Sequence, residues 1–147
     1  PAERAVALDT LFGFGKGHCQ RRTLMTTPAT LPDYRDAAHA LLSADGVRVS
    51  VIRDSAGFVA PRILAMIVAI ACEIAQQRIA SPSDIDSAVR LGLGYPAGPL
   101  SIGDRIGPAR VMQLLDEIHQ VTGDPRYRPS LWLRRRARLG LSLLHPD

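Results

Sequence analysis

The chain has 147 residues, of which 46% are hydrophobic and 22% are charged, a composition typical of about one ordinary globular domain. This composition excludes a disordered tail, a collagen-like rod and a coiled coil. Eighteen basic and fourteen acidic residues give a net charge of +4, which suits an anionic small molecule and is modest for a nucleic-acid-binding protein. The longest apolar run, residues 63–72, is about half of the roughly 20 residues that cross a bilayer, so no transmembrane helix is expected.

The N-terminus and the two cysteines indicate the origin and the compartment of the chain. Residues 1–4 show neither an initial methionine nor a signal sequence, which predicts that the chain is a piece of a longer protein. Cys19 and Cys72 are far apart and lack metal-binding spacing. They are therefore expected to be reduced, structural thiols, and the protein is expected to be cytoplasmic.

The first third of the chain predicts a strand, a helix and a strand. Residues 5–8 and 22–26 have strand-like patterns, and residues 11–17 are expected to form a loop. Thr30 and Asp33, on either side of Pro32, resemble a capping box that starts a helix. Alternating valines predict a strand over residues 47–52, after Gly46 has ended the helix. The expected apolar face of that helix consists of Tyr34, Ala37, Ala38, Leu41 and Leu42.

After Asp54 the pattern is helical throughout. Asp54 or Ser55 is the expected cap of a long helix over about residues 59–80, which is apolar nearly all round and is therefore predicted to be central and buried. Further helices are expected after the cap Ser81 as far as Gly92 or Gly94, over residues 100–106, from Pro108 to Gly123, and over residues 131–144 after the cap Ser130. The predicted fold class is mainly α, with residues 1–54 as a short strand–helix–strand lobe and residues 55–147 as a helical domain.

Two motifs suggest phosphate binding at first sight. Gly13, Gly15 and Gly17 lack the third glycine of a dinucleotide fingerprint, whose place His18 takes, so a simple loop is favoured. The arginine run 134–136 has three further arginines nearby, but a helix spreads three consecutive residues over most of its circumference. A solvated or salt-bridged face is therefore favoured, with contact to a phosphate-bearing cofactor and nucleic-acid binding as alternatives.

The titratable residues show no catalytic or metal-ligating set. The four histidines have no paired spacing for a metal. His119 has Asp116 one turn away, which fits an acid/base pair but more often means a surface hydrogen bond. Asp84, Asp86 and Asp104 are best explained as cap and turn residues. The residues alone therefore predict no active site.

Several motifs occur in one order along the chain. They are residues 54–59 (DSAGFV) with Arg62, residues 83–86 (SDID), residues 91–96 (LGLGYP) with residues 98–100 (GPL) and Asp104, and residues 123–129 (GDPRYRP). Over residues 22–144 the chain resembles 3-hydroxyacyl-CoA dehydrogenases at their C-terminal helical domain. Residues 27–30 (TPAT) and the unit around them resemble the last part of that family's nucleotide-binding domain. The ending, residues 142–147, resembles the second C-terminal copy found in the bacterial phenylacetate-degradation type.

The resemblance implies an NAD-dependent oxidation of a 3-hydroxyacyl-CoA to the 3-oxo form. The family's His–Glu pair falls near Leu11 and at Thr23, and its asparagine falls at Pro61, so no catalytic residue is expected in this chain. The residues that the resemblance places beside substrate are Gly57, Phe58 and Arg62. NAD is expected for the parent enzyme, while no cofactor and no metal are expected on this chain alone.

The expected role is that of the C-terminal portion of a 3-hydroxyacyl-CoA dehydrogenase in fatty-acid or aromatic-acid breakdown. This portion is expected to pack, dimerise and shape the acyl-CoA pocket. About ten apolar side chains on the long helix, each worth roughly 1.5–3 kcal/mol when buried, need more partners than one helical layer supplies. The expected partners are the rest of the dehydrogenase chain or a second subunit, as a homodimer, and acyl-CoA, but neither membrane nor nucleic acid. The alternatives are a purely structural dimerisation module and, more weakly, a basic nucleic-acid-binding domain.

Overall fold

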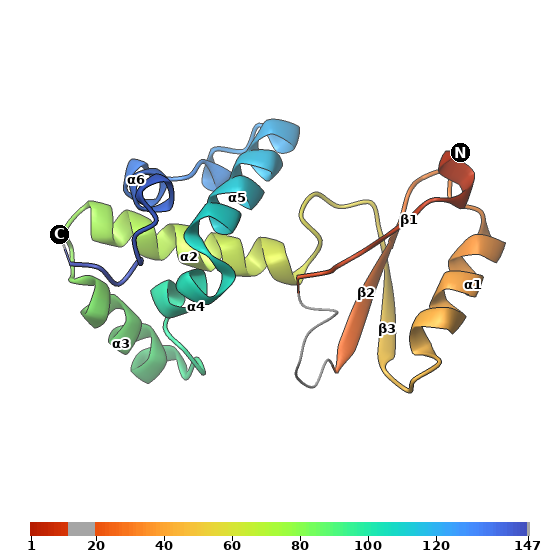
Figure 1. The fold of residues 1–147 in the computed structure, drawn as a ribbon, viewed down its shortest axis with the longest axis horizontal. Coiled ribbons are helices and arrows are strands. Elements are labelled where there is room, and N and C mark those ends of the chain that lie inside the picture. Colours follow the sequence, from red (N-terminus) through yellow and green to blue (C-terminus); the bar gives the residue numbers. More distant parts are fainter. Residues whose placement is uncertain (12–19, 147) are drawn as a thin grey trace. The chain divides into compact units, whose positions relative to one another are not determined.

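The computed structural model describes residues 1–11 and 20–146, which form two compact units, Pro1–Pro61 and Arg62–Asp147 (Figure 1). The predicted loop of residues 11–17 with its glycines, as well as His18 and Cys19, lies almost wholly outside the described residues. Helices predominate, and the strands form one small sheet near the N-terminus, which confirms the mainly α class.

The first unit is a three-stranded sheet with one helix. After a short 3₁₀ turn, η1 (Ala2–Arg4), come β1 (Val6–Leu8), β2 (Arg21–Thr26), α1 (Pro32–Ser43) and β3 (Arg48–Arg53). Strands β2 and β3 are parallel and α1 connects them, which confirms the predicted strand–helix–strand unit, while β1 pairs antiparallel with β2. Leu24 of β2 lies between Leu8 and Val51 in the register and is completely buried.

Helix α1 begins and packs differently from the prediction. Its N-cap is Leu31, without a capping side chain. The Thr30 hydroxyl instead accepts a hydrogen bond from the Thr27 amide at 2.9 Å and donates one to the Ala5 carbonyl at 2.7 Å, so the predicted capping box is wrong. The predicted apolar face is also not the covered one, because Leu41 is 77% exposed and Tyr34 is 38% exposed.

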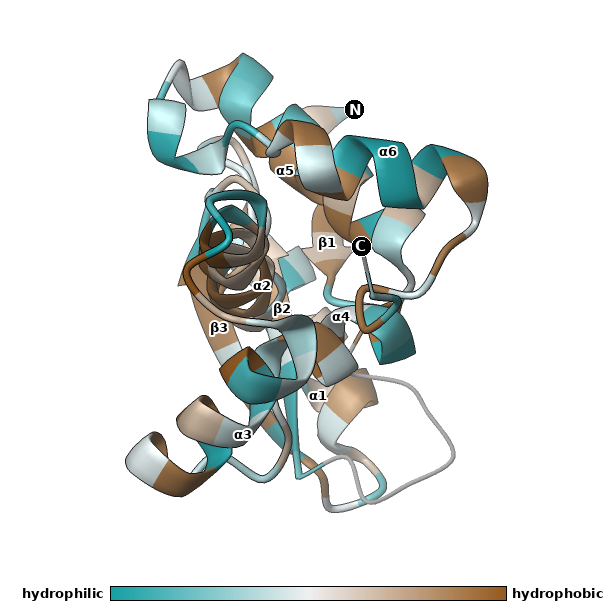
Figure 2. Ribbon diagram, turned by 90° about the vertical axis from the view of Figure 1, so that its left-hand side faces the viewer, coloured by the Kyte–Doolittle hydropathy of each residue, from teal (hydrophilic) through white to brown (hydrophobic). Residues whose placement is uncertain are grey.

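The second unit is helical, built on α2 (Ala60–Gln76), whose first two residues count with the first unit. In Figures 1 and 2, α2 runs between α3 on one side and α5 and α6 on the other. The other elements are α3 (Pro82–Leu93), α4 (Pro99–Ile106), α5 (Pro108–Thr122), the 3₁₀ turn η2 (Pro125–Tyr127) and α6 (Leu131–Leu139). The largest fully buried side chains of this unit are Leu100, Leu115, Ile118, Leu133, Leu143, Val68 and Val111.

The helix ends follow side-chain caps where the sequence supplies them. The hydroxyls of Ser81 and Ser130 accept hydrogen bonds from the third amide of α3 and α6, as predicted. Helix α6 ends at Leu139 rather than near residue 144, because Gly140 adopts the left-handed conformation with φ +67° and turns the chain back.

Helix α2 ends about four residues earlier than predicted. Arg78 has φ +56°, and the amides of Arg78 and Ile79 donate to the carbonyls of Ala75 and Ile74, the pair of bonds of a Schellman motif. Glycine usually holds this position. Because an arginine holds it here, the sequence carries no stop signal at this point.

The burial of α2 is one-sided, although the helix is apolar nearly all round (Figure 2). Its covered face consists of small or β-branched residues, among them Ala65, Val68 and Cys72, which are at most 1% exposed. Ile63 and Ile70 are 52% and 56% exposed. The prediction of a fully buried helix is therefore wrong for this chain, whose own elements cover one face of α2. No helix in the described part of the chain has the length and hydropathy needed to cross a membrane.

Candidate functional site

The turn that leads into α2 holds two of the three residues predicted beside substrate. Gly57 has φ +74°, and Phe58, a residue with a Cβ, has φ +55°. The Phe58 amide donates to the Ser55 carbonyl at 3.2 Å, and the Ser55 amide lies 3.2 Å from Sδ of Met25 on β2. Residues with a side chain rarely adopt the left-handed conformation. Those that do are held by the surrounding structure and cluster at active sites and ligand-binding segments.

The third predicted residue, Arg62, lies in the first turn of α2 and is half-buried. Pro61, directly before it, is buried and stands where the resemblance places the family's asparagine. A proline has neither a side-chain amide nor a backbone N–H, so it offers no donor to a substrate carbonyl. Gly57 and Phe58 belong to the first unit and Arg62 to the second.

Leu11 and Thr23, where the resemblance places the family's His–Glu pair, carry no titratable group. Thr23 lies on β2, opposite Ser50 of β3, and its carbonyl accepts a hydrogen bond from the Asp9 amide at 3.1 Å. Leu11 is apolar. In the part of the chain that the structure describes, no group of three His, Cys, Asp or Glu residues is placed to hold a metal ion.

Two carboxylates, Asp86 and Asp104, connect different elements of the helical unit by hydrogen bonds. The sequence predicted both as cap and turn residues. The first is Asp86 of α3, which is 7% exposed. It accepts hydrogen bonds from the amides of Leu100 and Ser101 at 2.7 and 3.0 Å and from the Ser101 hydroxyl at 2.5 Å. Asp86 therefore caps α4, whose own N-cap, Gly98, has no side chain. A Cβ on Gly98 would overlap the Asp86 carboxylate, so the glycine allows this approach.

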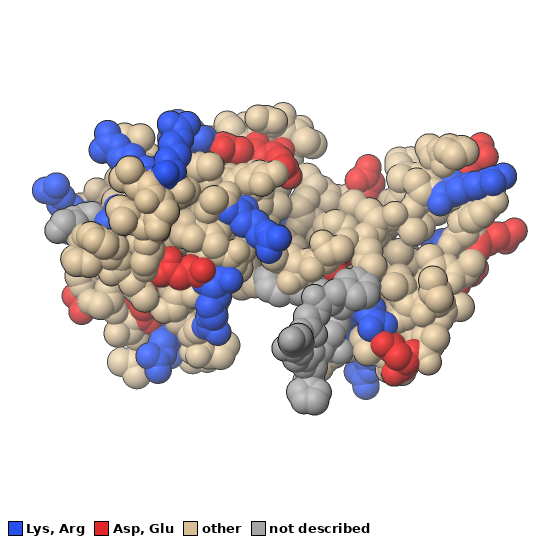
Figure 3. Space-filling model, in the orientation of Figure 1, with Lys and Arg blue, Asp and Glu red and all other residues tan. Residues whose placement is uncertain are grey.

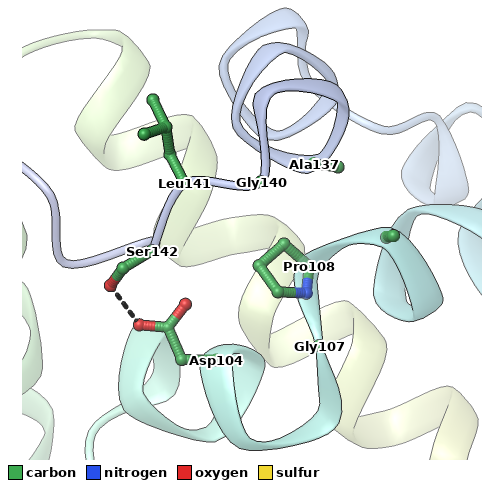
Figure 4. Close-up of a pocket in the computed structure, with 8 residues that line it drawn as sticks. Asp104, Gly107, Pro108, Ala137, Gly140, Leu141 and Ser142 are labelled. Carbon is green, nitrogen blue, oxygen red and sulfur yellow. Dashed lines mark hydrogen bonds between the residues drawn. The ribbon is translucent and has the colours of Figure 1, made fainter.

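The second carboxylate, Asp104 of α4, holds the segment that follows α6 (Figure 4). Its oxygens accept hydrogen bonds from the Leu143 amide at 2.7 Å and from the Ser142 hydroxyl at 2.5 Å. Leu143 is completely buried. A cavity of about 410 Å³ lies beside this contact, lined by the α4–α5 corner and the end of α6.

The arginines of the run 134–136 have different surroundings, as a helix requires. Arg134 forms a bidentate ion pair with Asp116 of α5, at 2.5 and 3.1 Å. Arg136 is buried, lies 3.6 Å over the Trp132 ring and donates to the His145 carbonyl at 3.1 Å. Arg135 faces solvent. On the visible face of the helical unit the basic side chains are spread out rather than gathered (Figure 3), which favours the solvated or salt-bridged interpretation.

His119 and Cys72 have surroundings that fit a structural role. Nδ1 of His119 lies 2.9 Å from the carbonyl oxygen of Asp124, whereas Asp116 pairs with Arg134. The predicted contact between His119 and Asp116 is therefore wrong. Cys72 is a free, completely buried thiol, and burial raises its pKa to about 12. A neutral thiol is a poor nucleophile and a poor metal ligand.

The comparison with protein families decides the identity of the helical unit. The family model for the 3-hydroxyacyl-CoA dehydrogenase C-terminal domain matches residues 57–142, more than half of the chain. The chain belongs to this family. The match begins in the turn that leads into α2 and ends at Ser142, so it includes Asp86 and Asp104.

Individual dehydrogenases of the family support the assignment. The chain is 42% identical over 98 residues to 3-hydroxyadipyl-CoA dehydrogenase of Escherichia coli K12, a match that covers 67% of this chain and 21% of that protein. It is 38% identical over 88 residues to a probable 3-hydroxybutyryl-CoA dehydrogenase of Deinococcus radiodurans, covering 60% and 32%. The chain thus spans well under half the length of these curated relatives.

Solved structures of the family share the fold. The crystal structure of 3-hydroxybutyryl-CoA dehydrogenase from Escherichia coli K12 matches with a TM-score of 0.79 at 34% identity, over 91% of this chain and 27% of that chain. The (S)-3-hydroxybutyryl-CoA dehydrogenase of Ralstonia eutropha matches with a TM-score of 0.77 at 29% identity, over 82% and 43%. Because these matches cover more than the family domain, they include part of the first unit.

Proposed function

We propose that the chain is the C-terminal portion of an NAD-dependent 3-hydroxyacyl-CoA dehydrogenase that oxidises a 3-hydroxyacyl-CoA in fatty-acid or aromatic-acid breakdown. In this proposal residues 1–54 are the end of a nucleotide-binding domain, and residues 55–147 are a helical domain like the second C-terminal copy of the phenylacetate type. This portion packs, dimerises and shapes the acyl-CoA pocket, and catalysis belongs to other residues of the parent. The curated relatives named as dehydrogenases of CoA thioesters support the proposal.

The start of α1 does not fit a phosphate group of NAD. The connection from β2 to α1 has no glycine-rich turn, and the hydroxyls of Thr27 and Thr30 are taken up by backbone groups and by each other. Helix α1 begins at Pro32, after the N-cap Leu31, and the missing amide of the proline reduces the donors for a phosphate at this terminus. In the parent enzyme NAD would supply the hydride acceptor, and this chain would contribute no step that involves it.

The observation that carries the packing role is the isoleucine stripe of α2, which we define as Ile63, Ile67, Ile70 and Ile74. These residues recur at i, i+4, i+7 and i+11 and therefore share one helix face. Ile63 and Ile70 are more than half exposed, and the other two are half-buried. Complete burial of such a side chain stabilises a protein by roughly 1.5–3 kcal/mol, so a covered stripe gains several kcal/mol from association.

A variant of this stripe tests the dimer. We expect the chain to sediment as a dimer, and the double variant Ile63→Asn/Ile70→Asn to sediment as a monomer with an unchanged circular dichroism spectrum. The matched control is Val121→Asn/Leu139→Asn, which alters two exposed apolar residues outside α2 and should leave the dimer intact. A monomeric wild-type chain at micromolar concentration contradicts the dimer. Dissociation of the control contradicts the assignment of the interface to the stripe.

Calorimetric titration tests the pocket role. Acetoacetyl-CoA, added with and without NADH, should bind the wild-type chain, and Arg62→Gln should weaken that binding at least tenfold without unfolding the chain. The control Arg110→Gln alters an exposed arginine of α5 and should bind normally. A folded dimer that binds no acyl-CoA contradicts the pocket role and favours the alternative, a purely structural dimerisation module.

A further inference from the structure

We draw no further inference here: the strongest candidate, the cavity of about 410 Å³ between the α4–α5 corner and the end of α6, indicates no class of ligand, because both oxygens of Asp104 in its wall already accept hydrogen bonds from the chain's own Ser142 and Leu143.

Discussion

The buried thiol of Cys72 should make the stability of the helical unit change with pH in the alkaline range. Burial raises its pKa from the ordinary 9.0 to about 12 in the folded chain. Below pH 9 both states hold the proton and the full stability is present. Between pH 9 and 12 the unfolded thiol ionises first, so stability falls as the pH rises, by up to about 1.4 kcal/mol for each pH unit.

Urea titrations at pH 8, 9 and 10 measure this effect. The comparison uses Cys72 and Cys72→Ala, both in a Cys19→Ser background so that a single thiol remains. We expect the free energy of unfolding to fall more steeply above pH 9 when Cys72 is present. Equal slopes in the two proteins would show that the folded thiol ionises as readily as the unfolded one.

Asp86 illustrates how one buried carboxylate supports a neighbouring helix. Asp86→Ala leaves the amides of Leu100 and Ser101 without their acceptor, and a buried donor without a partner costs roughly 1–3 kcal/mol. We expect the free energy of unfolding to fall by about 2–4 kcal/mol, read from the urea midpoint. Asp84→Ala, which removes an exposed carboxylate two residues away on the same helix, is the control and should cost less than half as much. Similar losses in both variants would contradict the role of Asp86.

At the scale of the element, α4 is fixed by contact with the end of the chain. A Cβ on Gly103 would lie 2.5 Å from Cδ1 of Leu143 and 2.8 Å from Cγ1 of Val68. Gly103→Ala should therefore destabilise the unit by roughly 1–3 kcal/mol, as overpacking does. Leu143→Ala removes one of the two obstacles, so the double variant should lose less stability than the sum of the single variants. Strict additivity in a urea double-mutant cycle would show that the two residues do not meet.

The sequence predicts elements well where a local signal marks them. Ser81 and Ser130 mark helix starts because the capping hydroxyl acts within three residues, and parallel pairing of β2 with β3 follows from the strand–helix–strand order. Arg78 ends α2 without a glycine, so no pattern marks it. Which face of α1 is covered depends on the elements that pack against the helix. They leave Leu41 exposed, although its spacing in the sequence places it on the predicted apolar face.

In the candidate site, too, features with a local sequence signal could be predicted and features that depend on tertiary contacts could not. The motif that contains Asp86 is visible in the sequence, and the resemblance it carries identifies the family. Its partners are 14 and 15 residues away, beyond the range of a local capping rule, so its role in capping α4 required the fold. The one-sided burial of α2 is likewise a tertiary property, because an apolar helix looks the same in sequence whether its own chain or a partner covers it.

At the scale of the whole molecule, the two units differ sharply in what they bury. Among the described residues of the first unit, Leu24 is the one buried Leu, Ile or Val side chain, whereas the second unit buries Leu100, Leu115, Leu133 and others. Since buried apolar area is the main source of stability, the first unit should open at lower free energy. Hydrogen exchange should be faster in β2 and β3 than in the middle of α2 and α5.

Leu115→Ala and its counterpart Leu24→Ala separate the two units. Each substitution removes a completely buried leucine, which costs roughly 2–5 kcal/mol in the unit that holds it. Leu115→Ala should speed hydrogen exchange in the helices and leave the exchange of β2 and β3 unchanged, because the first unit opens separately and at a lower free energy. Leu24→Ala should speed exchange in the strands alone. If either variant accelerates both units equally, the chain unfolds as one cooperative body, and the small core of the first unit does not set its stability.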